Sequence, residues 1–258
     1  MKYNRFLPLL IPLLVFALLE IFYFQPKLIY VVLVLSTALY FFTIRQFLLD
    51  GTVEEKWYNL VILPVYFSAG VVAMSTLVPR ETVSGRVLLQ SFFLLNAGFL
   101  YLYLRSIYHY LYDEKAQEKY SLKNLSAYGN FLSFYFLASS VYGFQSFLNL
   151  PVWLLMVILV VFSGMTVYQV IWSHRINRQI GIFYILVFCL IIIELAWSVS
   201  FLTLSYYVLG LIVAICYYVL IGLVKAYLLD NLSAKTVKWY LIFGFLALIL
   251  VLLTARWI

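Results

Sequence analysis

Two acidic residues within long apolar segments are the strongest candidates for chemistry in this sequence. Glu20 and Glu194 both lie where a bilayer-spanning helix is expected, away from the charged loops. A charged carboxylate is unfavourable in hydrocarbon, so such a group must be protonated, paired or open to a wet cavity. The pattern therefore predicts a proton or cation relay, or an anchor for a cationic group, at Glu194 above all.

Each carboxyl also has a purely structural interpretation. Glu194 can be a neutral carboxyl that is hydrogen-bonded to Ser198 or to a tyrosine, and either side chain can reach the outer interface. For Glu20, which is closer to the end of its segment, the structural interpretation is the favoured one. Both residues are equally far from the start of their segments, so we expect them at one level in the outer leaflet.

Two arginines form a second candidate site. Arg80 and Arg86 flank the short polar loop Pro79–Arg86. The planar fork of a guanidinium suits a phosphate or a carboxylate, so the pair could bind an anionic group. The favoured alternative is a solvated connector whose arginines meet lipid headgroups, because two arginines make no specific motif.

Signatures of enzymes and cofactor sites are absent from the sequence. His109 and His174 have no second ligand at metal-binding spacing, and Cys189 and Cys216 lie in apolar segments without a CxxC pattern. There is no GxSxG elbow and no phosphate-binding GxxxxGK[ST] loop. We therefore expect no metal, no cofactor and no nucleic-acid partner, and we favour a protein that is not an enzyme.

The composition defines the elements that must position these residues. Of 258 residues, 66% are hydrophobic and only 10% are charged, whereas soluble domains have about 25% charged residues. The apolar residues form long runs without alternation, which indicates helices and excludes a β-barrel. The sequence predicts an all-α polytopic membrane protein that forms one domain over residues 1–258.

Nine segments are long enough to cross a hydrocarbon core of about 30 Å. The first is interpreted as an uncleaved signal anchor, because no small-residue cleavage site follows it. The turn between the seventh and eighth segments is inferred from length alone. The predicted spans are Phe6–Phe24, Leu28–Leu49, Trp57–Val78, Val87–Tyr112, Ala127–Leu148, Pro151–Trp172, Ile180–Val199, Leu204–Leu229 and Val237–Thr254.

The basic residues predict the orientation. With the N-terminus inside, most of the 17 Lys and Arg residues fall in cytoplasmic segments, and the outer segments hold Lys27, Arg80, Arg86 and Arg256. The positive-inside rule thus predicts a cytoplasmic N-terminus and an outer C-terminus, in a plasma or inner membrane.

A weak internal repeat suggests helical hairpins of like orientation. Tyr110-Leu-Tyr-Asp113 and Tyr227-Leu-Leu-Asp230 each end a span, and Asn124-Leu-Ser and Asn231-Leu-Ser each precede the next span. A four-plus-four duplication after an extra first span would explain the pattern. Helix caps and interface anchors select the same residue types without any duplication, and that explanation is favoured.

Three functions stay open at this point. The first is a carrier or binding protein for a small or lipid-like substrate, with Glu194 in its path. The second is a non-catalytic scaffold or a subunit of an envelope complex, and the third is a membrane enzyme that acts on a lipid-linked substrate. The expected partners are membrane lipids and either a second copy of the chain or another membrane subunit.

Overall fold

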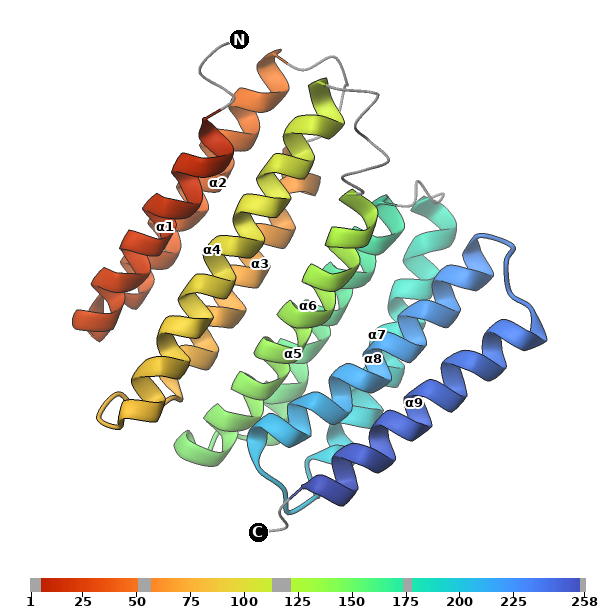
Figure 1. Ribbon diagram of the computed structural model, residues 1–258. Helices are drawn as coiled ribbons and strands as arrows, with labels where there is room; N and C mark the ends of the chain where they lie inside the picture. The colour runs from red at the N-terminus through yellow and green to blue at the C-terminus, as the bar shows by residue number, and fades with distance from the viewer. Residues whose placement is uncertain (1–5, 51–56, 113–121, 174–177, 256–258) are drawn as a thin grey trace. The chain divides into compact units, whose positions relative to one another are not determined.

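The computed structural model describes residues 6–50, 57–112, 122–173 and 178–255. Within these ranges the chain forms nine long α-helices and one short 3-10 turn, with no strand (Figure 1). All nine helices are long and apolar enough to cross a membrane. The predicted all-α bundle of nine spans is confirmed. Asp113, His174 and Arg256, named above, lie outside the described residues.

The helix bounds agree with the predicted spans to within a few residues. The division between the seventh and eighth spans, which was inferred from length alone, is real, because α7 ends at Val199 and α8 begins at Tyr206. The elements are α1 (Leu7–Phe24), η2 (Pro26–Leu28), α2 (Ile29–Asp50), α3 (Trp57–Thr76), α4 (Val83–Tyr112), α5 (Leu122–Leu148), α6 (Val152–Ser173), α7 (Arg178–Val199), α8 (Tyr206–Leu228) and α9 (Ala234–Thr254).

The helices group into two compact units, Met1–Ser133 and Phe134–Ile258. The first unit contains α1 to α4 and the start of α5, and the second contains the rest of α5 and α6 to α9. That the whole chain acts as a single domain stays a prediction.

In the first unit, α1 packs against α2 and α4, and α3 packs against the same two helices. A buried chain of hydrogen bonds joins three of them. The Tyr40 hydroxyl on α2 lies 2.7 Å from the Ser68 hydroxyl on α3, which donates to the Asn96 side-chain oxygen on α4 at 3.0 Å. Such polar contacts between membrane helices each contribute about 0.6 kcal/mol on average, and they fix which faces meet.

A proline explains another contact in the same unit. Pro64 lies inside α3 and has no backbone N–H, so the carbonyl of Leu60, one turn earlier, lacks its usual helical partner. The hydroxyl of Tyr103 on α4 donates to that carbonyl oxygen at 3.1 Å. A backbone group that would otherwise be unsatisfied is thereby paired within the bundle.

The second unit contains a close helix contact. Gly210 on α8 lies directly against Ser139 on α5, and a Cβ at Gly210 would come within 2.6 Å of the Ser139 Cα. The sequence pairs Ser139/Gly143 and Gly210/Ala214 have the four-residue spacing of small residues at helix contacts. Nearby, Tyr217 stacks on Phe134 with ring centroids 4.3 Å apart.

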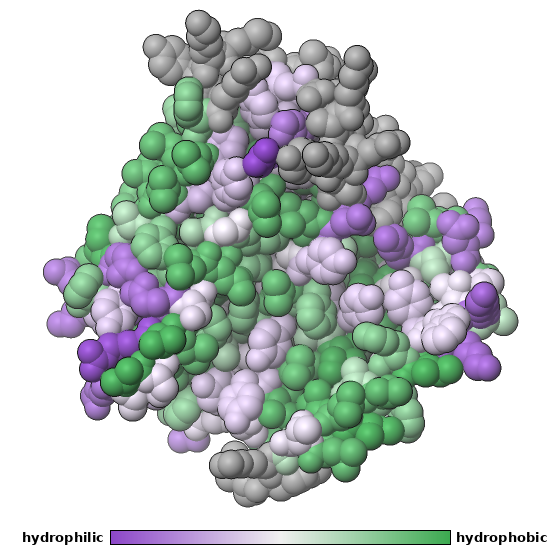
Figure 2. Space-filling view, in the orientation of Figure 1, coloured by the Kyte–Doolittle hydropathy of each residue, from purple (hydrophilic) through white to green (hydrophobic). Residues whose placement is uncertain are grey.

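Apolar side chains cover much of the surface (Figure 2). In water such a surface would cause aggregation, whereas in a bilayer it is the ordinary outer face of a bundle. Together with the nine apolar helices, this surface identifies an integral membrane protein.

The order of neighbours is the same in two parts of the chain. α2 packs on α3, α3 on α4, and α2 also reaches α4, while α6, α7 and α8 repeat this pattern. A duplication would produce this pattern, and so would any three antiparallel helices joined by short loops. The duplication therefore stays a prediction.

Candidate functional site

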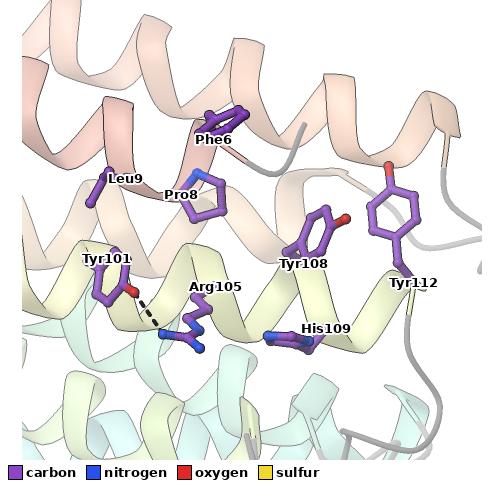
Figure 3. A pocket seen from close by; sticks show the side chains of 8 residues that line it. All are labelled: Phe6, Pro8, Leu9, Tyr101, Arg105, Tyr108, His109 and Tyr112. Atoms are coloured by element: carbon purple, nitrogen blue, oxygen red, sulfur yellow. Dashed lines mark hydrogen bonds between the residues drawn. The ribbon is translucent and has the colours of Figure 1, made fainter. Parts of the chain in front are cut away.

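A pocket of about 550 Å³ opens in the first unit, where α1 begins and α4 ends. Three of its lining residues come from the start of α1 and five from the last turns of α4 (Figure 3). The α1 side is apolar, and the α4 side carries aromatic and basic groups. The lining residues are Phe6, Pro8, Leu9, Tyr101, Arg105, Tyr108, His109 and Tyr112.

Arg105 provides the permanent positive charge of the pocket. Its side chain is half-buried, and its Nη1 donates a hydrogen bond to the Tyr101 hydroxyl at 2.7 Å. The guanidinium carbon also lies 5.8 Å from the centre of the Tyr101 ring. Tyr101 lies one helical turn before Arg105 on α4, and these two contacts between them hold the guanidinium in place.

His109 lies one turn beyond Arg105 on the same face of α4, where Figure 3 draws the two side chains next to each other. A basic residue in the last turn of a helix also interacts favourably with the helix dipole. The eight lining residues thus include an arginine and a histidine and no carboxylate.

The other aromatic residues fix the wall of the pocket. The Tyr112 hydroxyl donates to the carbonyl oxygen of Phe47 at 2.8 Å. This carbonyl belongs to the last turn of α2, so the contact ties the end of α4 to the end of α2. Tyr108 packs against both residues, with ring centroids 6.0 Å from Phe47 and 4.8 Å from Tyr112.

The start of α1 forms the opposite wall. Pro8 lies in the first turn of α1, where its missing N–H removes no helical hydrogen bond. The amide of Leu10 donates to the Phe6 carbonyl at 2.9 Å, which closes that turn. The side chains of Phe6 and Leu9 remain largely exposed and offer apolar surface beside the basic groups.

α4 is longer than a hydrocarbon core is thick. With 30 residues, the helix is about 45 Å long and exceeds a hydrocarbon core of about 30 Å by roughly 15 Å. Arg105 lies two turns before Tyr112, about 10 Å from the end of the helix.

The two walls of the pocket differ in chemical character. Among the described residues, no group of three or more His, Cys, Asp or Glu side chains is placed to hold a metal ion. A basic and aromatic wall that faces an apolar wall can bind an amphipathic molecule, with its charged group against α4 and its apolar part against α1.

The structure gives Arg80 a local role. Its Nη1 donates to the carbonyl oxygens of Phe22 at 3.3 Å and Tyr23 at 2.8 Å, at the end of α1. The guanidinium also lies 4.8 Å from the centre of the Phe22 ring. Partial burial lowers the pKa of Arg80, though the group stays charged at neutral pH.

Arg86 is exposed, and its Nη2 donates to the carbonyl oxygen of Glu81 at 3.3 Å. The two arginines are thus engaged with different backbone carbonyls. The binding of an anion by Arg80 and Arg86 stays a prediction.

Glu20 and Glu194 have different surroundings. Glu20 is half-buried on α1 in the first unit, whereas Glu194 is exposed on α7 in the second. The Ser198 hydroxyl donates to the backbone carbonyl of Glu194 at 2.8 Å, a bond within the helix rather than one to the carboxyl. Neither carboxyl lines the pocket at α1 and α4. Their roles in a relay or in cation binding stay predictions.

Sequence reasoning missed Arg105 and His109 as site residues. Arg105 was counted among the charges that set topology, and His109 was set aside because it has no metal partner. The signal that could have found them is the spacing of Tyr101, Arg105 and His109, each four residues from the last, which places them on one face of a helix. Nothing in the sequence indicated that α1 would lie opposite that face.

Comparisons with known proteins give no further assignment. No family model, no curated protein and no solved structure matches this chain. The function must therefore be inferred from the pocket and its surroundings.

Proposed function

We propose that this protein binds, and as a carrier moves, a lipid-like molecule through the pocket between α1 and α4. The observation that carries the proposal is the pairing of an apolar wall at Pro8 and Leu9 with the basic and aromatic wall around Arg105. A molecule with a charged end and an apolar body matches both walls, whereas a fully polar solute would leave the α1 wall unused.

The position of the pocket supports the same ligand class. The charge rule assigns the start of α1 to the cytoplasmic face, so the pocket would open at the inner leaflet. A lipid can enter such a site laterally from the bilayer with its headgroup at the interface. This proposal replaces Glu194 with Arg105 as the main binding residue, because Glu194 does not line the pocket.

Labelling with photoreactive lipids tests the proposal. The full-length protein would be placed in liposomes with analogues of phosphatidylcholine, diacylglycerol or phosphatidic acid, each carrying a diazirine on the same acyl chain. Peptide mapping should then find labelled residues between Tyr101 and Tyr112, next to the pocket. Leu9→Trp, which fills the pocket from an exposed position, should reduce this labelling by more than half.

Leu13→Trp is the matched control. Leu13 lies one turn further along α1 and is similarly exposed, at 59% against 55% for Leu9, but it does not line the pocket. This variant should label like the wild type. Equal labelling in both tryptophan variants with all three lipids, or labelling spread evenly over the exposed helices, would refute the proposal.

A second candidate is a subunit of a membrane complex, which α9 favours. This helix packs chiefly on α8, and Gly244 is its one buried residue in the described chain. A complex needs such an exposed surface, but lipid alone can also cover it. A failure of the labelling test would make this candidate the leading one.

A further inference from the structure

We infer that the part of the ligand held against α4 is a flat, conjugated ring, which identifies the ligand as an aromatic or quinone-like head with a hydrocarbon tail. This inference rests on the proposed function, since it concerns the same pocket between α1 and α4. It adds the chemical class of the head and assigns the contact with its ring to Phe6 and Tyr108. A charged group at the polar end of the ligand is then a substituent of this ring.

Flat side chains make up most of the lining of the pocket. The lining residues with a planar group are Phe6, Tyr101, Arg105, Tyr108, His109 and Tyr112. Two aromatic rings in contact stabilise each other beyond the burial of their area, and a guanidinium stacks on a ring in a similar way. An acyl chain in the same place would gain only the burial of its surface. The lining therefore favours a ring over a chain.

Two of the tyrosines use their hydroxyl groups on the protein itself. The Tyr101 oxygen accepts the hydrogen bond from Arg105, and the Tyr112 hydroxyl donates to the carbonyl oxygen of Phe47. These bonds hold the two rings, and a tyrosine provides contact area at little cost in conformational entropy. What these tyrosines offer to a ligand is the surface of their rings, so the recognition of a ring needs no further hydrogen-bond donor in the pocket.

Tyr108 and Phe6 bring aromatic rings to the pocket from its two walls. Figure 3 shows Tyr108 rising from α4 on the side where Phe6 and Pro8 lie at the start of α1. Neighbouring rings hold Tyr108, because its centroid lies 4.8 Å from that of Tyr112 and 5.8 Å from that of His109. Phe6 is 70% exposed, so most of its ring surface is open to contact. A flat ring in the pocket can therefore contact an aromatic side chain on each wall.

The size of the pocket agrees with a ring and the first part of a tail. Its volume of about 550 Å³ lies within the range of about 300–1,000 Å³ that is usual for drug-sized ligands. Beyond the pocket, the apolar surface of α1 continues from Leu9 to Leu13, and both side chains are exposed. The tail can lie along this surface, in contact with lipid, while the ring stays between the two walls.

A matched pair of ligands tests the inference. Para-decylphenol and para-decylcyclohexanol share the tail, the hydroxyl group and the ring size, and they differ in whether the ring is flat. Binding of each radiolabelled compound to the purified full-length protein in phosphatidylcholine nanodiscs would be measured as a mole fraction of the lipid, with binding to empty nanodiscs subtracted. We expect the phenol to bind at least about fivefold more tightly, because it makes two aromatic contacts. Equal affinities would overturn the inference.

Variants at the two rings locate the preference. Phe6→Leu and Tyr108→Leu each remove one ring from a wall of the pocket, so each should reduce the preference for the phenol about two- to tenfold. Tyr108→Phe keeps the ring and should leave the preference within about twofold of the wild type. An equal loss in Tyr108→Phe and Tyr108→Leu would show that the hydroxyl is recognised rather than the ring, and this would contradict the inference.

Phe24→Leu is the matched control for Phe6→Leu. Phe24 lies at the other end of α1 and is similarly exposed, at 75% against 70% for Phe6, but it does not line the pocket. Its replacement should leave the preference for the phenol unchanged. The same loss in both phenylalanine variants would mean that the phenol responds to exposed aromatic residues in general, and the assignment to this pocket would then be wrong.

The outcomes separate this inference from the proposed function. Photolabelling that is sensitive to Leu9→Trp, together with equal binding of the phenol and the cyclohexanol, would overturn the ring and leave lipid binding intact. Para-ethylphenol has the same ring without the long tail. If it binds as tightly as para-decylphenol, and both depend on Phe6 and Tyr108, the ring is supported and the lipid-like ligand is contradicted.

Discussion

The terminal helices of the chain are held in opposite ways. α1 packs between α2 and α4, and its last carbonyls accept hydrogen bonds from Arg80. α9 packs chiefly on α8, and Gly244 is its one buried residue. A helix that packs on two neighbours can form one wall of a defined pocket, whereas a helix that packs chiefly on one neighbour can meet lipid or another protein with its other faces. This difference explains why α1 lines a pocket.

Hydrogen bonds and close contacts between helices occur in both units, and two examples show what each kind does. In the first unit, hydroxyl and amide side chains join three helices through Tyr40, Ser68 and Asn96. In the second, the contact of Gly210 with Ser139 and the stacking of Phe134 on Tyr217 are prominent. Directed hydrogen bonds specify one arrangement of helices, while small residues set how closely two helices can approach. Substitutions of the two kinds should therefore have different effects.

The largest effect is expected from filling the close contact in the second unit. Gly210→Leu would place side-chain atoms where the backbone of Ser139 lies, and neither helix can move without disturbing its other neighbours. Overpacking of this kind lowers the free energy of unfolding by about 1–3 kcal/mol, and more where backbone is struck. We expect a loss of about 3 kcal/mol, measured by unfolding of the purified protein in mixed micelles with increasing SDS.

Gly98→Leu is the control for this substitution. Gly98 lies on α4 with no other residue close to the position of an added Cβ. Leucine is a better helix former than glycine by about 0.8 kcal/mol, so this variant should be as stable as the wild type or slightly more stable. Similar losses in the two glycine variants would show that the contact between α5 and α8 does not hold the second unit together.

Two tyrosines test how much a hydrogen bond to a backbone carbonyl contributes when that carbonyl has no other donor and when it has one. Tyr103→Phe in the first unit leaves the Leu60 carbonyl without a partner, because Pro64 supplies no N–H. The loss of a partner for a buried backbone group should lower the free energy of unfolding by about 1–3 kcal/mol. Tyr142→Phe in the second unit should have a smaller effect, about 0.6 kcal/mol. The carbonyl of Ala196, to which Tyr142 donates, also accepts from the Ser200 amide at 3.0 Å.

A double-mutant cycle identifies the cause. In a Pro64→Ala background the alanine N–H can donate to the Leu60 carbonyl, so Tyr103→Phe should then have an effect below about 1 kcal/mol. An unchanged effect of Tyr103→Phe in that background would mean that the tyrosine stabilises the unit by packing and not by replacing the missing helical hydrogen bond.

The fold could be predicted from the sequence because membrane helices depend on local properties. Length, hydropathy and charged loops are visible in the chain itself, so even the turn between Val199 and Tyr206 was located correctly from length. Small residues at Gly210 and Ser139 also indicated close helix contacts. These features can be recognised in the sequence without knowing which helices are neighbours.

The candidate site could not be predicted in the same way, because it depends on which helices meet. Arg105 becomes a site residue only when the start of α1 lies opposite it, and α1 is far from α4 in the sequence. Glu194 attracted attention because a carboxyl in an apolar segment is unusual by itself, but exposure on α7 depends on packing. The same limit applies to Arg80, a candidate for anion binding in the sequence, because its carbonyl partners lie on α1.

The smallest effect is expected at Glu194, on the exposed face of α7. Removal of a carboxyl from a surface that faces lipid relieves a desolvation cost near the helix end, so Glu194→Leu should change the free energy of unfolding by about 0–1 kcal/mol, in the stabilising direction. Glu194→Gln should match the wild type within a few tenths of a kcal/mol. Neither variant should alter the photolabelling of the pocket, because Glu194 does not line it. The measurement is SDS unfolding of the wild type and both variants in one detergent, with the photolabelling experiment in parallel. A loss of about 0.6 kcal/mol or more in Glu194→Leu that is absent in Glu194→Gln would instead mean that the carboxyl makes an interhelical hydrogen bond.

Loss of lipid binding in both variants would return Glu194 to the ligand path and would contradict the assignment of the site to the first unit alone.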